Sequence, residues 1–135
     1  MADTQVTIVG NLAADPEVRS TSSGATVASF RVAVTPRVRE GDQWRDGETS
    51  FFRCTAWRSL ADNLAESVGK GTRVIVVGRL RQRSWETPEG EKRSVTEIEA
   101  DEVGISLKFA QAQSRKAGRE HAAAGRDQFT DEPPF

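Results

Sequence analysis

Apolar and polar residues alternate along five stretches of the first 109 residues. The stretches are rich in Val, Ile, Thr and aromatic residues, and they read TQVTIVGNL, ATVASFRVAV, ETSFFRCTAW, TRVIVVGRLRQRSW and RSVTEIEADEVG. Turn-prone segments such as STSSG, REGDQ and TPEGE lie between them. Alternation with β-branched residues is typical of strands with one buried face, so the pattern predicts five β-strands.

One stretch between the third and fourth predicted strands has a helical period instead. Leu60, Leu64 and Val68 recur every four residues, Ser59 stands where it can cap the first turn, and Gly69 is placed to end the helix. The order of three strands, a helix and two strands predicts a mainly β protein, a five-stranded OB-fold barrel with one short helix between strands 3 and 4. Other small β architectures stay open at this point.

The composition changes near Phe109. The last 26 residues, AQAQSRKAGREHAAAGRDQFTDEPPF, contain almost no large apolar residue except two phenylalanines. A segment without an apolar stripe has nothing to anchor it to a core. The sequence therefore predicts a domain over residues 1–109 and a flexible, disordered tail over 110–135, with an acidic tip at 130–135.

Composition excludes several classes of function. Lys and Arg number 19 against 20 Asp and Glu, so the net charge of −1 points to no partner by itself. One cysteine, Cys54, and one histidine, His121, rule out a disulfide framework, a multi-cysteine zinc site and most imidazole-based catalysis. We expect no enzyme activity, no cofactor and no metal. The start MADTQVTIVG lacks the pattern of a signal peptide, which favours a cytoplasmic protein.

Residues two apart on a strand share a face, and two of the predicted strands then carry mixed rows of aromatic and basic side chains. The rows are Phe51, Arg53, Thr55 and Trp57 on the third strand, and Arg79, Arg81, Arg83 and Trp85 on the fourth. Unpaired bases stack on rings, at about 1 to 3 kcal/mol per base, while arginines bind phosphates. The alternative is that the rings fill the core or a subunit contact and the arginines form a solvated face.

Three further features bear on the same surface. Trp44 is predicted to lie in the loop between the second and third strands, where it either stacks a base or packs on its own hairpin. Lys70 and Arg73 extend a basic stretch that runs to Arg93 and contains seven basic residues against three acidic ones. The carboxylates of the fifth strand, Glu97, Glu99 and Asp101, share a face, and we expect a solvated face there rather than a cation site.

The chain strongly resembles bacterial single-stranded DNA-binding proteins of the actinobacterial type. The resembling segments include TIVGNLAADPEVR, SGATVASFRVAVTPR, FFRCTAWRSLADNLAESVGKGTRVIVVGRLRQRSWET, EADEVGISLKFA and the terminal DEPPF. The resemblance implies an OB-fold subunit of a homotetramer, a partner that is single-stranded DNA, no catalysis and no membrane. It also implies roles in DNA replication, recombination and repair. The short tail is similar to that of an accessory paralogue.

Individual residues acquire roles from this resemblance. Phe51, Trp57 and Trp85 fall where the family stacks bases, and Arg81 and Arg83 fall in its basic strand. A further stacking tryptophan of some members is replaced by valine at position 38, and tryptophan 44 is a candidate to compensate for it. The alternatives are an OB-fold adaptor that works through protein contacts and an RNA-binding module.

The tip has its own predicted role in binding replication, recombination and repair proteins. Asp131 and Glu132 would meet a basic rim on the partner, while Pro133 and Pro134 keep the chain extended. The Phe135 ring and terminal carboxylate would then enter an apolar pocket. The simpler alternative is an acidic terminus that only increases solubility.

Overall fold

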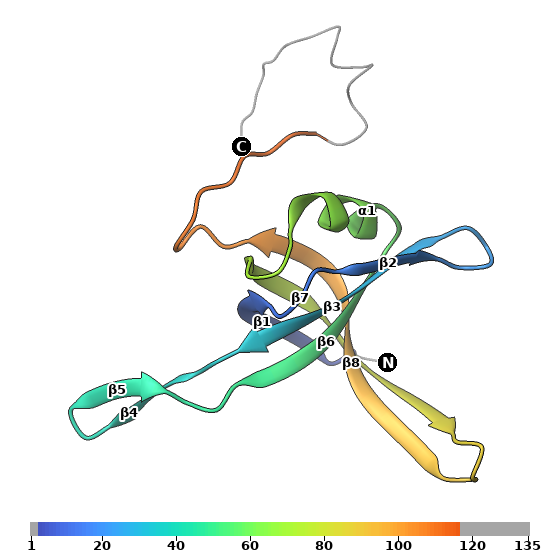
Figure 1. Cartoon of the computed structure of the whole chain (residues 1–135), viewed down its shortest axis with the longest axis horizontal. Coiled ribbons are helices and arrows are strands. Elements are labelled where there is room, and N and C mark those ends of the chain that lie inside the picture. The colour runs from blue at the N-terminus through green and yellow to red at the C-terminus, as the bar shows by residue number, and fades with distance from the viewer. Residues whose placement is uncertain (1–2, 117–135) are drawn as a thin grey trace, which may run out of the picture.

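The computed structural model describes residues 3–116 of the chain, which form eight strands and one helix (Figure 1). In chain order these are β1 (Gln5–Leu12), β2 (Glu17–Ser20), β3 (Thr26–Val34), β4 (Arg37–Glu40), β5 (Gln43–Asp46), β6 (Ser50–Trp57), α1 (Arg58–Ser67), β7 (Arg73–Glu86) and β8 (Lys92–Ile105). The strands β1, β3, β6, β7 and β8 correspond to the five predicted ones, and α1 lies between the third and fourth of them. The mainly β fold with one helix is therefore confirmed.

Six strands form one curled sheet in the order β1-β7-β8-β6-β3-β2, and β1 also pairs with β3. The β1–β3 pairing joins Asn11 to Ala33 and Leu12 to Val32. Gly10 makes this approach possible, because a Cβ at that position would collide with the carbonyl oxygen of Ala33. All pairings in this sheet are antiparallel except that of β6 with β8.

The inward side chains of the curled sheet form the hydrophobic core. Its buried members are Leu12, Ala28, Phe30, Val32, Cys54, Ala56, Ala61, Leu64, Val74, Val76, Ile98 and Ala100. Most of them come from alternate positions of the five long strands, and Ala61 and Leu64 come from α1, which packs against β3 and β6. The alternation of apolar and polar residues in the sequence thus corresponds to the buried and the solvent-facing side of each strand.

Three short strands depart from the prediction. The segments that form β2, β4 and β5 were expected to be loops, and Trp44 was expected in a loop but lies on β5. Each of these strands has only four residues, most of them exposed, so no apolar alternation marks them. They are defined by backbone pairing and by turns such as Gly41, whose φ of 65° suits a two-residue hairpin connection.

The ends of α1 also differ from the prediction. The helix starts at Arg58, directly after β6, and Trp57 is the N-cap without a side-chain hydrogen bond, so Ser59 is not the cap. The helix stops when Val68 turns extended, and the Val68 N–H donates to the Leu64 carbonyl at 3.0 Å. The left-handed glycine of this connection is Gly71, with φ 91°, rather than the predicted Gly69.

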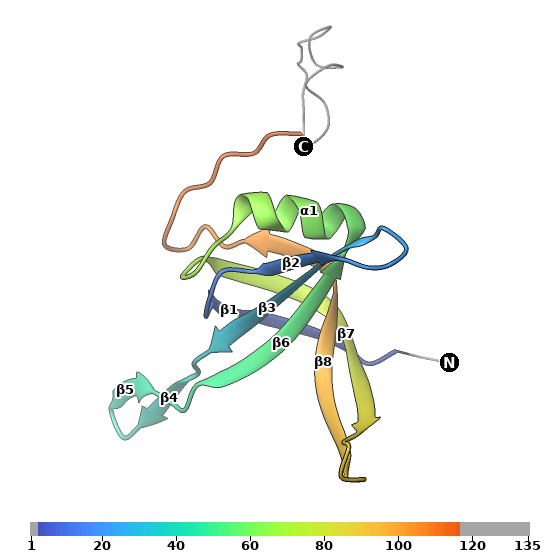
Figure 2. The same cartoon turned by 45° about the vertical axis from the view of Figure 1, so that its right-hand side comes forward.

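Two hairpins project from the body on the side away from α1 (Figure 2). One is β4–β5, and the other is β7–β8, whose connection at residues 87–91 is the turn-prone segment TPEGE. In β8, Asp101 is an extra residue opposite the step from Val77 to Gly78, which makes a β-bulge. Within residues 3–116 the only helix has 10 residues and is too short to cross a membrane.

Candidate nucleic-acid interface

Four adjacent strands of the sheet present their solvent-facing side chains on one surface, which we call the outer face. Its rows are Arg31 on β3; Phe51, Arg53, Thr55 and Trp57 on β6; Val95, Glu97, Glu99 and Asp101 on β8; and Arg79, Arg81, Arg83 and Trp85 on β7. The strand order places β8 between β6 and β7. The two predicted rows therefore share a surface, with a row of β8 between them.

The three aromatic rings of the outer face are open to solvent. Phe51 is 54% exposed, Trp57 42% and Trp85 46%, whereas their neighbours Cys54 and Ala56 on the inward side of β6 are fully buried. Rings of this size normally bury most of their area in a monomer. Their exposure argues against the core-filling alternative and leaves their flat faces available for stacking.

Arg31 is a member of the outer face that the sequence analysis missed. It lies opposite Arg53 in the β3–β6 pairing, and its guanidinium sits 4.8 Å from the centre of the Phe51 ring. No carboxylate lies within ion-pair distance of Arg31 in the described part of the chain. The signal was present, because Ser29, Arg31 and Ala33 are alternate positions of a predicted strand.

The arginines of β7 are paired with the carboxylates of β8, which we call the carboxylate row (Glu97, Glu99 and Asp101). Arg79 donates from Nε and Nη2 to the two oxygens of Asp101, at 3.2 and 3.0 Å. Arg81 donates to Glu99 at 3.1 Å and to Asp3 at 3.3 Å. Arg83 donates to Glu97 at 2.7 Å. The two rows therefore face solvent and are joined to each other by ion pairs.

This pairing is graded along β7. The side chain of Arg79 is 23% exposed and also lies 3.5 Å from Glu99, whereas that of Arg83 is 60% exposed and lies 5.6 Å from the centre of the Trp85 ring. The hydrogen bond to Glu99 raises the pKa of Arg81, with Asp3 adding to the shift. Arg83, the arginine of the row nearest the hairpin tip, makes one hydrogen bond and has the most free N–H groups.

Glu97 is the least exposed member of the carboxylate row, at 12%, and it also lies 3.9 Å from Arg53 across the β6–β8 pairing. The charge of Glu97 also reaches Cys54, which points into the core from β6 and pairs with Ile98, the residue after Glu97. Burial raises the pKa of the Cys54 thiol to about 12, and the charge of Glu97 adds to the shift. Cys54 is a protonated core residue and not a nucleophile.

The carboxylate row shows no sign of a cation site. Within residues 3–116 no group of three or more His, Cys, Asp or Glu side chains is arranged to hold a metal ion. Each of these carboxylates instead has a guanidinium within 3.9 Å. Their charge is balanced by arginine.

The β4–β5 hairpin does not place Trp44 where Val38 is. Val38 lies opposite Arg45 and Trp44 lies opposite Arg39 in the pairing register. Directly opposed residues of an antiparallel pair share a face and successive residues alternate, so Trp44 and Val38 point to opposite sides of the hairpin. Trp44 is 57% exposed and can stack a base, but not at the position of Val38.

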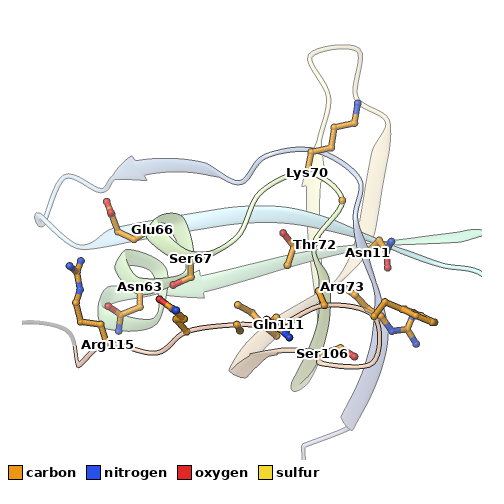
Figure 3. A pocket seen from close by; sticks show the side chains of 16 residues that line it. Asn11, Asn63, Glu66, Ser67, Lys70, Thr72, Arg73, Ser106, Gln111 and Arg115 are labelled. Atoms are coloured by element: carbon orange, nitrogen blue, oxygen red, sulfur yellow. The ribbon is translucent and has the colours of Figure 1, made fainter.

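Lys70 and Arg73 are not part of the outer face. They line a pocket of about 1240 Å³ between α1, the start of β7 and residues 105–115, and none of the aromatic rings of the outer face borders it (Figure 3). Arg73 lies 5.4 Å from the centre of the Phe109 ring, and its Nε is buried without a hydrogen-bond partner. A phosphate-binding role for these two residues stays a prediction.

The predicted partner-binding tip, with Asp131, Glu132, Pro133, Pro134 and Phe135, lies outside the described residues. The same holds for His121. Their roles stay predictions from the sequence.

Comparison with known proteins gives a consistent result. The model of the single-strand binding protein family matches residues 3–106. The chain is 60% identical over 119 residues to the single-stranded DNA-binding protein of Mycobacterium leprae, which covers 87% of this chain and 71% of that protein. It is 59% identical over 121 residues to the protein of the same name from Corynebacterium glutamicum, and the match covers 88% of this chain and 54% of that protein.

A solved structure supports the fold. The crystal structure of the small single-stranded DNA-binding protein from Streptomyces coelicolor is similar with a TM-score of 0.68 and 36% sequence identity. The likeness covers 79% of this chain and 97% of that chain. This neighbour and the family match support the OB-fold part of the prediction.

Proposed function

This chain belongs to the single-strand binding protein family, and on that premise we propose that it binds and protects single-stranded DNA through its outer face. Binding is independent of sequence, because stacking uses the flat face that every base has. The protein acts without catalysis. Its relatives carry the name of single-stranded DNA-binding proteins, which supports the same ligand here.

One observation carries this proposal: three exposed rings, Phe51, Trp57 and Trp85, share a surface with guanidinium groups. Arg31 and Arg83, next to the rings of Phe51 and Trp85, are the first candidates for phosphate contacts. Arg53 follows, since its nearest carboxylate is 3.9 Å away. Arg79 and Arg81 are more fully paired and are assigned a smaller share.

Tryptophan fluorescence tests the proposal directly, since two of the three rings are tryptophans. Titration with an oligo-dT of about 35 nucleotides should quench the emission as bases stack on Trp57 and Trp85. The matched control is a duplex of the same length, which offers no unpaired base. Unchanged emission and no complex with the single strand would reject the proposal.

We assign the assembly as a homotetramer from family membership, and one surface supports association. Val9, Ile75 and Val77 are partly exposed apolar residues on neighbouring strands, with Val9 opposite Ile75. Clustered apolar side chains of this kind commonly mark contacts between subunits. Light scattering at micromolar concentration should give four times the chain mass, and a monomer would contradict the assignment.

The tail is assigned the recruitment of replication, recombination and repair proteins through residues 130–135. The support is its sequence, DEPPF, in which two carboxylates precede two prolines and a terminal ring. Removing these five residues should abolish capture of such partners while single-stranded DNA binding persists. Unchanged partner capture would leave the tip with a solubilising role only.

A further inference from the structure

The carboxylate row (Glu97, Glu99 and Asp101) runs through the middle of the proposed DNA-binding surface. It lies on β8, between the ring-bearing strands β6 and β7. The family's name gives no reason for negative charge at this place, since the ligand is itself a polyanion. The arrangement calls for a role that attraction to phosphate does not supply.

The row and its neighbours are close to charge balance. Arg53, Arg79, Arg81 and Arg83 make ion pairs with Glu97, Glu99, Asp101 and Asp3, four positive charges with four negative ones. A phosphate that approaches the centre of the outer face must either displace a carboxylate from its arginine or lie beside it. Displacing the carboxylate is unfavourable because the arginine's N–H groups already bind it. Lying beside the carboxylate is unfavourable because the two negative charges repel.

Two of the rings, Phe51 and Trp85, lie at the edges of this balanced zone. Phe51 is next to Arg31 on the β3 side, and Trp85 is next to Arg83 toward the hairpin tip. A single strand can turn its bases onto these rings and direct its phosphates to Arg31 and to the N–H groups of Arg83 that its one hydrogen bond to Glu97 leaves free. A duplex cannot do so, because its bases are paired and stacked internally and it offers the protein its phosphates and groove edges.

We propose that the carboxylate row is a specificity element that makes the outer face reject duplex DNA. By balancing the charge of the arginines, Glu97, Glu99 and Asp101 make phosphate contact alone insufficient for binding. Stacking on the rings then becomes the term that decides which ligand binds. This inference rests on the proposed function. It holds that the carboxylate row sets the ratio of the affinities for single-stranded and duplex DNA, and not the binding of single-stranded DNA itself.

Paired variants test the proposal in the full-length chain. Glu97→Gln with Glu99→Gln removes two charges while keeping the size of both side chains and one acceptor oxygen on each. The control, Asp62→Asn with Glu66→Gln, removes the same charge from exposed positions of α1. Affinities for fluorescein-labelled oligo-dT and for a mixed-sequence duplex of equal length are measured by anisotropy at low salt.

The double variant on β8 should bind the duplex about tenfold more tightly than the wild type and the single strand at most about threefold more tightly. The control should change both affinities alike. Equal gains for both ligands, no gain for the duplex, or a loss of affinity for both would overturn the proposal. Wild-type binding to oligo-dT separately tests the proposed function, so the two failures are distinguishable.

A second variant guards against a folding effect of the substitutions. Asp101 is the extra residue of the β-bulge and is partly exposed, so Asp101→Asn disturbs neither the core nor a paired position of the ladder. It should raise the duplex affinity about twofold to threefold, with an unchanged melting temperature. If Asp101→Asn leaves both the melting temperature and the duplex affinity unchanged, the result counts against the proposal.

Discussion

The two sides of the outer face treat their arginines differently. On the β3–β6 side, Arg31 lies over the ring of Phe51 with no carboxylate near it in the described residues. On the β7–β8 side, Arg79 makes two hydrogen bonds to Asp101. An arginine held against a ring keeps its N–H groups for a ligand, whereas one held by a carboxylate has already used them. Basic residues on one surface are therefore not equivalent in binding.

The largest effect expected from breaking this arrangement is the loss of a ring. Trp57→Ala should weaken binding of single-stranded DNA about fivefold to 150-fold, since one stacked base contributes about 1 to 3 kcal/mol. Fluorescence anisotropy with oligo-dT measures the change. Duplex binding should not change, because a duplex has no free base to stack. An equal loss for both ligands would show that Trp57 acts through the fold.

The next largest effect separates the two kinds of arginine. Arg31→Ala should weaken single-strand binding about fivefold and reduce the slope of log K against log salt by about 0.7, as expected for one lost phosphate contact. Arg79→Ala is the matched variant on the other side and should change both quantities much less. A larger effect from Arg79 than from Arg31 would reverse the comparison.

A smaller effect is expected from the core beneath the carboxylate row. The pKa of Cys54 is about 12 in the folded protein, above its value in an unfolded chain, so the thiolate forms more readily after unfolding. The stabilisation is complete below about pH 8 and is lost as pH rises toward 12, by about 2 kcal/mol near pH 10. Urea denaturation across this range measures it. Cys54→Ala should remove this contribution to the decline, and an unchanged pH profile would contradict the assignment.

The smallest effect is expected at the β4–β5 hairpin. Trp44→Ala should weaken single-strand binding about twofold, because the ring is on a projecting hairpin outside the four rows of the outer face. Anisotropy under the same conditions as for Trp57→Ala gives the comparison. A loss as large as that of Trp57→Ala would add the hairpin to the principal stacking surface.

The parts of the fold that bury apolar side chains could be predicted from the sequence. Alternation located the five long strands, and the four-residue spacing of Leu60 and Leu64 located α1. The strands β2, β4 and β5 could not be found in this way, because exposed four-residue strands carry no apolar pattern. The cap assignment failed because β6 runs directly into α1, which leaves Ser59 inside the helix.

The candidate site was predictable in its members but not in its pairing. Alternation along β6 and β7 correctly grouped Phe51, Trp57 and Trp85 with arginines on a single surface. The neighbours across strands depend on register, and the sequence alone did not place β8 between β6 and β7. The ion pairs of Arg79 and Arg81 with Glu99 and Asp101 depend on the register of the β7–β8 hairpin and its bulge, which the sequence pattern did not give.

The central claim is that stacking on the aromatic rings supplies most of the affinity for single-stranded DNA, because the arginines between them are already paired. The salt dependence of binding to one short oligonucleotide tests this claim most directly. An oligo-dT of about 8 nucleotides is within the length that one OB-fold covers. The account predicts a slope of log K against log salt of about −1.4 to −2.1, for two or three phosphate contacts, at about 0.7 per contact. A slope of about −4 or steeper would mean that the paired arginines bind phosphates after all, and it would contradict the account.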